Sequence, residues 1–129
     1  MQGVPYISDR IEVKQSSIHG YGVFARSGLD EGLVIERAYC LTLSTMFDKV
    51  DDVLKDYVVG VRDHGRYGKS SAVLLGFAMI YNYSDKPNVL YKKNKKTFSF
   101  YTTRYIDKGE ELLINYGENS HSALRINNG

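Results

Sequence analysis

The feature that most limits the fold of this chain is the shortness of its apolar runs, which polar or glycine-containing turns interrupt every few residues. Arg10–Gln15 alternates apolar and polar side chains, which is the period of a half-buried strand. Leu33–Glu36 and Ala38–Leu43 are rich in β-forming residues and are too short to be typical helices. The first third of the chain therefore predicts a β-meander.

Two later segments predict short helices. Between Asp48 and Val61, apolar residues recur at intervals of three and four, which is the helix period. The apolar run Ala72–Tyr81 is compatible with a buried helix or a strand, and its Ala, Leu and Met content favours a short helix. We expect a mainly β fold that contains these short helices.

The last third predicts a hairpin followed by a final strand. Tyr91–Tyr105 has the pattern of a hairpin with Lys92–Lys96 at its tip, and Asp107–Gly109 forms a turn. Glu111–Tyr116 has the composition of a strand, and residues 118–129 form a polar tail. A chain of 129 residues leaves room for one small domain.

Composition argues against several classes of protein. A net charge of +2 is too small to indicate nucleic-acid binding by bulk attraction. Cys40, the single cysteine, cannot form an internal disulfide, and three scattered histidines lack the spacing of metal ligands. The first residues lack the pattern of a signal peptide, and the longest apolar run is far shorter than the roughly 20 residues that cross a bilayer. We expect an intracellular protein without a metal site.

Four segments together indicate a reaction. In chain order they are Ser17–Ala25, Tyr57, Asn82–Asn88 and Gly109–Gly117. Each is a weak signal alone, because short glycine motifs are common. Together and in this order they resemble the SET-domain protein lysine methyltransferases, most closely the compact viral SET enzymes that lack flanking zinc-binding regions. The resemblance covers about residues 10–117.

This resemblance implies a fold, a reaction and a cofactor. The fold is the SET β-clip with a C-terminal pseudoknot, in which the C-terminal segment threads under a preceding loop, and a single SET domain would span residues 1–129. The reaction is transfer of a methyl group from S-adenosylmethionine to a lysine amine of a basic protein, such as a histone or a chromatin-like protein. The resemblance also implies a homodimer and a cytoplasmic or chromatin-associated location, which is nuclear in a eukaryotic cell.

Tyrosine side chains suit the needs of this reaction. The lysine amine must be deprotonated and aligned with the methyl carbon, and an aromatic channel lowers the pKa of the lysine while hydroxyl oxygens contact the polarised methyl group. By resemblance, Tyr116 is the catalytic hydroxyl and Tyr57 lines the lysine channel. A strand-end packing role for Tyr116 and a core role for Tyr57 are the alternatives.

The cofactor residues are also assigned by resemblance. The glycine loop would let its backbone approach the methionine portion of the cofactor, and an asparagine would add polar contacts. The residues are His19, Gly20, Tyr21, Gly22, Asn82, Tyr83 and His121. An ordinary glycine turn, a chain-capping asparagine and a tail histidine are the alternatives.

Adjacent strand residues point to opposite faces, so Glu110 and Glu111 should not share a site and are interpreted as structural. Pro87–Asn88 is assigned to shaping the pseudoknot loop.

Four residues depart from the family pattern. Tyr83 stands where the family usually has His, Asn115 replaces Asp, and Ile114 replaces the aromatic residue that affects how many methyl groups are added. His121 stands in for aromatic residues that cover the cofactor in the viral enzymes. These departures motivate an alternative function, a catalytically silent SET-like module that binds a peptide or the cofactor.

Two charge clusters have alternative interpretations. The lysines of the hairpin either form a solvated tip or contact a phosphate backbone; they are Lys92, Lys93, Lys95 and Lys96. Carboxylates beside Tyr57 either form a solvated helix face or attract a basic peptide; they are Asp48, Asp51, Asp52 and Asp56.

Overall fold

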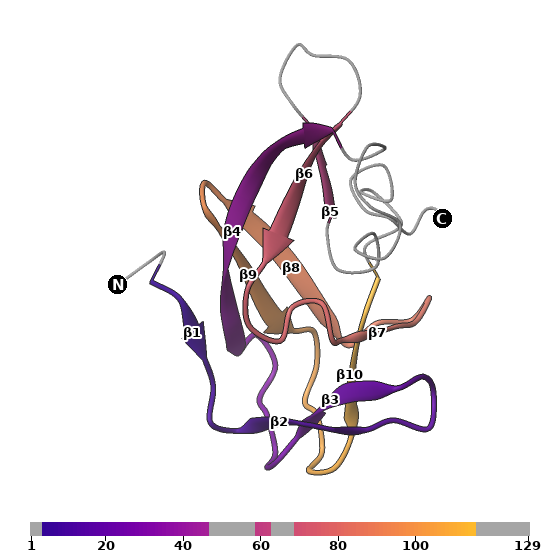
Figure 1. Ribbon diagram of the computed structural model, residues 1–129. Helices are drawn as coiled ribbons and strands as arrows, with labels where there is room; N and C mark the ends of the chain where they lie inside the picture. Colours follow the sequence, from indigo (N-terminus) through magenta and orange to yellow (C-terminus); the bar gives the residue numbers. More distant parts are fainter. Residues whose placement is uncertain (1–3, 47–58, 63–68, 116–129) are drawn as a thin grey trace. The chain divides into compact units, whose positions relative to one another are not determined.

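A computed structural model describes residues 4–46, 59–62 and 69–115 of the chain (Figure 1). Every regular element in these three stretches is a β-strand. Because the described residues contain no long apolar helix, none of them forms a helix that could span a membrane. The mainly β fold class is confirmed.

The strands belong to two compact units. Among the described residues, the first unit combines 4–39 with 76–115, and the second combines 40–46, 59–62 and 69–75. Strand β4 begins in the first unit and continues into the second. The strands are β1 (Tyr6–Ile7), β2 (Ile11–Gln15), β3 (Tyr21–Ala25), β4 (Val34–Met46), β5 (Val59–Arg62), β6 (Lys69–Leu74), β7 (Asn82–Tyr83), β8 (Val89–Asn94), β9 (Thr97–Thr102) and β10 (Glu111–Ile114).

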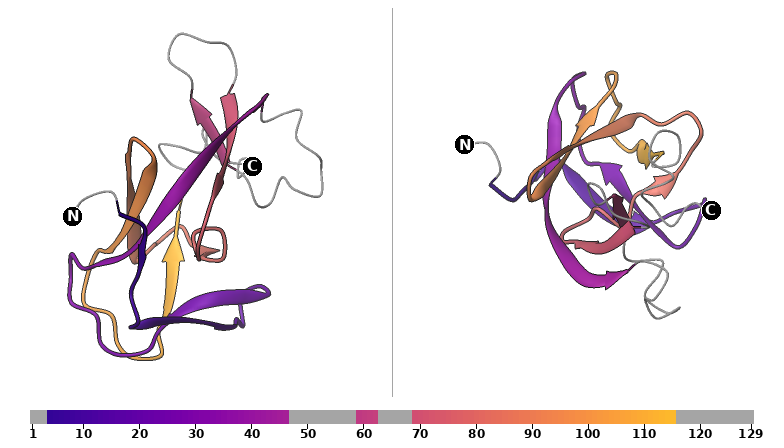
Figure 2. Two further views of the ribbon diagram at one scale, coloured as in Figure 1. Left: turned by 60° about the vertical axis from the view of Figure 1, so that its left-hand side comes forward. Right: turned by 90° about the horizontal axis from the view of Figure 1, so that it is seen from above.

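In the first unit, strands that are distant in sequence lie side by side. The order is β2-β3-β10-β8-β9-β4, with β1 on β4 and β7 on β10. Strands β2 and β3 form an antiparallel hairpin in which Ile11 lies opposite Ala25. Strand β10 pairs antiparallel with the other edge of β3 (Figure 2). The meander predicted for the first third is therefore wrong, because β4 pairs with β1 and β9 instead of β3.

Strand β10 passes between the two ends of one loop. It runs parallel to both β7 and β8, and Ile114 is paired with Tyr83 of the first and with Val89 of the second. The connecting loop also donates the backbone N–H of Asn88 to the carbonyl of Leu113 at 3.1 Å. This pairing on both edges is the arrangement expected of a C-terminal segment threaded under a preceding loop.

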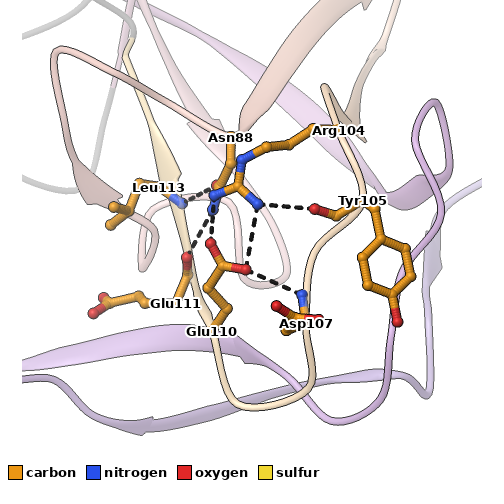
Figure 3. A network of polar contacts seen from close by, with 7 residues as sticks. All are labelled: Asn88, Arg104, Tyr105, Asp107, Glu110, Glu111 and Leu113. Carbon is orange, nitrogen blue, oxygen red and sulfur yellow. Dashed lines mark hydrogen bonds and ion pairs between the residues drawn. The ribbon is translucent and has the colours of Figure 1, made fainter.

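The side chain of Asn88 fastens β10 in this position. Its Nδ2 donates to the carbonyl of Glu111 at 2.9 Å, and its Oδ1 accepts the N–H of Leu113 at 2.7 Å (Figure 3). Only 4% of Asn88 is exposed, so water cannot easily take the place of these partners. The prediction that Asn88 shapes the pseudoknot loop is confirmed.

An ion pair closes the turn before β10. The guanidinium of Arg104 pairs with the carboxylate of Glu110, and this hydrogen bond lowers the pKa of Glu110. The same carboxylate accepts the N–H of Asp107 at 3.0 Å. Figure 3 shows Glu110 reaching Arg104 while the side chain of Glu111 extends away from them. The pair is largely exposed, so we expect it to order the turn more than to stabilise the fold.

The core of the first unit contains one fully buried carboxylate, Glu36. Its Oε2 accepts the N–H of Phe77 at 2.7 Å, and its Oε1 accepts the hydroxyl of Tyr81 at 2.7 Å. Burial raises the pKa of Glu36 from 4.5 to about 7, although these hydrogen bonds favour the charged form. The largest buried apolar side chains of this unit are Val23, Leu29, Ile35, Val89, Phe100, Ile106, Leu112 and Ile114.

The helix predicted for residues 72–81 is wrong. Residues 72–74 belong to β6, which pairs with β4 on one side and with β5 on the other. Residues 75–81 form bends and turns, and Gly76 has a φ of +99°, outside the helical region. Strand pairing on both edges outweighs the small difference in intrinsic helix propensity.

Three further predicted elements need correction. The helix predicted for residues 48–61 is wrong at its C-terminal end, where β5 begins, and its residues 48–58 lie outside the described residues. The two predicted strands at 33–36 and 38–43 are one continuous strand, β4, which begins at Val34 and continues to Met46. The predicted hairpin is confirmed, but its strands continue to the pair Asn94 and Thr97, so only two lysines form the tip.

Replacing Asn88 should weaken the first unit. Asn88→Ala would leave the carbonyl of Glu111 and the N–H of Leu113 without their buried partner, and we expect the free energy of unfolding to fall by about 2–4 kcal/mol. Urea unfolding of the purified variants would measure this. The control is Asn94→Ala on the exposed end of β8, which should change the value by less than about 0.5 kcal/mol. Equal losses in the two variants would contradict a clamp at Asn88.

Glu36 should make stability depend on pH. Its pKa is about 7 in the folded chain and near 4.5 when unfolded, so above pH 4.5 the unfolded state releases this proton more readily. Stability should therefore fall by about 3 kcal/mol as the pH rises from 4.5 to 7. Glu36→Gln keeps the size of the side chain and should flatten this part of the profile. Urea unfolding of both proteins at several pH values is the measurement, and parallel profiles would rule out Glu36 as the cause.

Candidate functional site

The side chain of Asn82 joins two segments that the sequence assigns to cofactor binding. Asn82 begins β7 and is 8% exposed. Its Nδ2 lies 3.1 Å from the carbonyl of His19 and 3.2 Å from the carbonyl of Tyr21, and it donates to the carboxylate of Glu111 at 2.8 Å. One buried amide therefore links the glycine loop, the start of β7 and the start of β10.

Ser16 organises the loop between β2 and β3. Its Oγ donates to Oε1 of Glu111 at 2.9 Å and accepts the N–H groups of Ile18 at 2.9 Å and His19 at 3.4 Å. Its backbone N–H donates to the carbonyl of Gly20 at 2.8 Å. The loop is thus closed on itself and tied to β10 through a carboxylate.

The two glycines of the loop have different structural roles. Gly20 has a φ of +49°, and a Cβ built there would meet nothing within 4 Å, so its backbone is open to an approaching molecule. A Cβ on Gly22 would lie 2.1 Å from Oε2 of Glu111 and 3.0 Å from Nδ2 of Asn82. The missing side chain at Gly22 therefore makes room for the carboxylate of Glu111.

Aromatic side chains beside this network are accessible. Tyr21 is 62% exposed and Tyr83 is 54% exposed, while His19 is also on the surface. The backbone of Tyr83 pairs with Ile114 of β10. The exchange of the usual His for Tyr83 therefore changes an exposed side chain and is compatible with the backbone pairing.

Three of the predicted site residues, Tyr57, Tyr116 and His121, lie outside the described residues. Strand β10 ends at Ile114, two positions before Tyr116. Within residues 4–46, 59–62 and 69–115, no three His, Cys, Asp or Glu side chains gather in a way that could hold a metal ion.

Sequence reasoning missed Ser16 and the part that Glu111 plays. Glu110 and Glu111 do have separate partners, as the strand alternation predicts, but Glu111 contacts the loop that is assigned to the cofactor. A usable signal was present. Glu111 is the one charged residue in a strand that is otherwise apolar, and its alternate position places it on a different face from Leu112.

The chain belongs to the SET domain family, whose model matches residues 20–117. It is therefore identified as a protein-lysine N-methyltransferase, an enzyme that takes its methyl group from S-adenosylmethionine. It is 32% identical over 124 residues to a histone-lysine N-methyltransferase of Schizosaccharomyces pombe that is specific for lysine 37 of histone H3. That match covers 89% of this chain and 78% of the relative.

A solved structure also resembles the chain. It is that of a Plasmodium falciparum protein classed as a candidate histone methyltransferase, with a TM-score of 0.70 and 26% identity. The match covers 88% of this chain and 97% of the solved one. The SET fold that the sequence motifs imply is confirmed.

Gly22→Ala should disturb the network more than Gly20→Ala. The new Cβ at residue 22 would push the carboxylate of Glu111 away from Ser16 and Asn82, and we expect a loss of about 1–3 kcal/mol in the free energy of unfolding. At residue 20 the methyl group meets no atom, so the positive φ alone costs about 1 kcal/mol. Thermal and urea unfolding would rank the variants, and a Gly22→Ala protein as stable as the wild type would refute this account.

Proposed function

We propose that this chain methylates a lysine in a basic, unstructured segment of a histone, with S-adenosylmethionine held by the glycine loop and the start of β7. The observation that carries this proposal is the convergence at Asn82 of the segments that resemble the family's cofactor motifs. The histone H3 specificity of the Schizosaccharomyces pombe relative supports the substrate class.

The residues around Asn82 suit such a cofactor chemically. The open backbone at Gly20 and the exposed rings of Tyr21 and Tyr83 offer polar and aromatic surface in one region of the first unit. The residues proposed to hold it are His19, Gly20, Tyr21, Gly22, Asn82, Tyr83 and His121. When bound, S-adenosylmethionine supplies a methyl group activated by a positively charged sulfur.

Two tyrosines are proposed to serve the lysine. Tyr116 would present its hydroxyl beside the transferring methyl group, where an oxygen interacts favourably with developing positive charge. Tyr57 would form part of an aromatic channel wall that excludes water and so favours the neutral amine. In the chain, Tyr116 follows β10 closely, and the loop between β7 and β8 grips that strand.

Several finer features extend the proposal. By its resemblance to the compact viral SET enzymes, the chain would act as a homodimer in which residues 1–129 form one SET domain. Chromatin association, with a nuclear location in a eukaryotic cell, follows from a histone substrate. A weak contact with nucleic acid is proposed for the exposed lysines of the β8–β9 hairpin, which are Lys92, Lys93, Lys95 and Lys96.

Tyr116→Phe should remove most methyl transfer. Loss of one hydroxyl that stabilises the transition state typically lowers kcat by about a hundredfold or more. Binding of S-adenosylhomocysteine, followed by calorimetry, should stay within about twofold of wild type because the cofactor contacts are left in place. The reaction would be followed by mass spectrometry of lysines in mixed histones after incubation with methyl-labelled S-adenosylmethionine.

The control for this experiment is Tyr105→Phe, because Tyr105 is exposed and is not among the residues proposed to bind cofactor or lysine. It should retain full activity. Equal activity of Tyr116→Phe and wild type would remove Tyr116 from the mechanism. Cofactor binding by the wild type without any labelled lysine would instead favour the alternative, a SET-like module that binds without turnover.

A further inference from the structure

We propose that Glu111 is a positioning residue, whose carboxylate sets the shape of the cofactor loop through Ser16 and Asn82. This inference rests on the proposed function, in which the loop holds S-adenosylmethionine. It assigns Glu111 a specific task in the reaction, whereas the sequence alone gives it only a structural one.

The first step of the argument is that one carboxylate is shared by two separate elements. Oε1 of Glu111 accepts the hydroxyl of Ser16 at 2.9 Å, and Oε2 accepts the amide of Asn82 at 2.8 Å. The bare backbone of Gly22 leaves the space that this carboxylate fills. The carboxylate of Glu111 is therefore held by two hydrogen bonds, in a space that a side chain at position 22 would close.

The second step is that both branches end on the backbone of the same loop residue, His19. Through Ser16, the network reaches the N–H of His19 at 3.4 Å, and through Asn82 it reaches the carbonyl of His19 at 3.1 Å. The backbone of Glu111 is itself held by Asn88. The loop conformation is thus coupled to the threaded strand that leads toward Tyr116.

The third step is that the side chain at position 111 must accept hydrogen bonds from both Ser16 and Asn82, which a carboxylate can do and an amide cannot do without disturbing the loop. Nδ2 of Asn82 can only donate, so a glutamine at 111 would have to turn its oxygen toward Asn82 and its NH₂ toward Ser16. The hydroxyl oxygen of Ser16 already accepts N–H groups from Ile18 and His19. To accept a third donor, Ser16 would have to release one of these loop amides.

The test compares Glu111→Gln with wild type in the full chain. We expect the KM for S-adenosylmethionine and the Kd for S-adenosylhomocysteine to rise about tenfold, the typical effect of losing one such hydrogen bond. The kcat should stay within about threefold, because the groups proposed to contact the methyl are unchanged. A general loss of folded protein would lower activity without raising KM, so this split separates positioning from stability.

The matched control is Glu110→Gln, the adjacent carboxylate, which pairs with Arg104 and does not contact the loop. It should leave KM unchanged. Ser16→Ala removes the hydrogen bond between Ser16 and Glu111 while leaving the carboxylate in place. If Glu111→Gln does not fold, the same measurements on Ser16→Ala test the proposal. The double variant that combines Glu111→Gln with Ser16→Ala should bind the cofactor about as tightly as whichever single variant binds it less tightly, because both changes break the same chain of contacts. Additive losses would contradict this.

The outcomes distinguish the inference from the proposed function. With an active wild type, an unchanged KM in both Glu111→Gln and Ser16→Ala would overturn the positioning role and leave methyl transfer standing. An inactive wild type would refute the proposed function, and amide hydrogen exchange at Ile18 and His19 would then decide the loop-holding role. Faster exchange in Glu111→Gln than in Glu110→Gln would support it, and equal exchange would overturn it.

Discussion

The constraint on which the first unit depends is that β10 must be hydrogen bonded along both edges while it passes through a loop. Unpaired backbone groups in that position would be buried away from water at a considerable energetic cost. The side-chain amide of Asn88 helps to meet this requirement, because it bonds the backbone of β10 at Glu111 and Leu113. A second asparagine, Asn82, bonds the side chain of Glu111 at the start of the same strand. An asparagine can donate and accept at once, which suits a position beside a strand end.

Three glutamates show how position decides the role of the same carboxylate. Glu36 is fully buried, and the loss of hydration raises its pKa. Glu110 lies near the surface, where the guanidinium of Arg104 lowers its pKa and the pair orders a turn. Glu111 lies between these extremes and receives donors from two elements. The interior carboxylate affects stability, the outer one affects a turn, and the intermediate one is available to organise a site.

The local pattern of apolar and polar residues predicted most of the strands, but it did not predict which strands pair with one another. The alternation in residues 10–15, the hairpin and the apolar final run all gave strands, because a period of two is a local property. The placement of β10 beside β3 depends on contacts across most of the chain, which periodicity does not contain. The helix predicted for the run 72–81 is wrong because residues 72–74 are paired in β6 and the chain then turns at Gly76, which has a positive φ. For the site, the order of the motifs indicated the family, but the hydrogen bond between Glu111 and Ser16 joins residues far apart in sequence, which no local pattern predicts.

The pairing of β3 with β10 also has a consequence for how the protein is made. The β2–β3 hairpin is synthesised well before the strand that covers its free edge, because β10 follows β3 only after strands β4 to β9 and their loops. Contacts between segments so distant in sequence form slowly, because a long stretch of chain must first be brought together. During synthesis, that edge has no partner and could pair with other chains. We therefore expect the nascent polypeptide to depend on chaperones until β10 has passed through its loop.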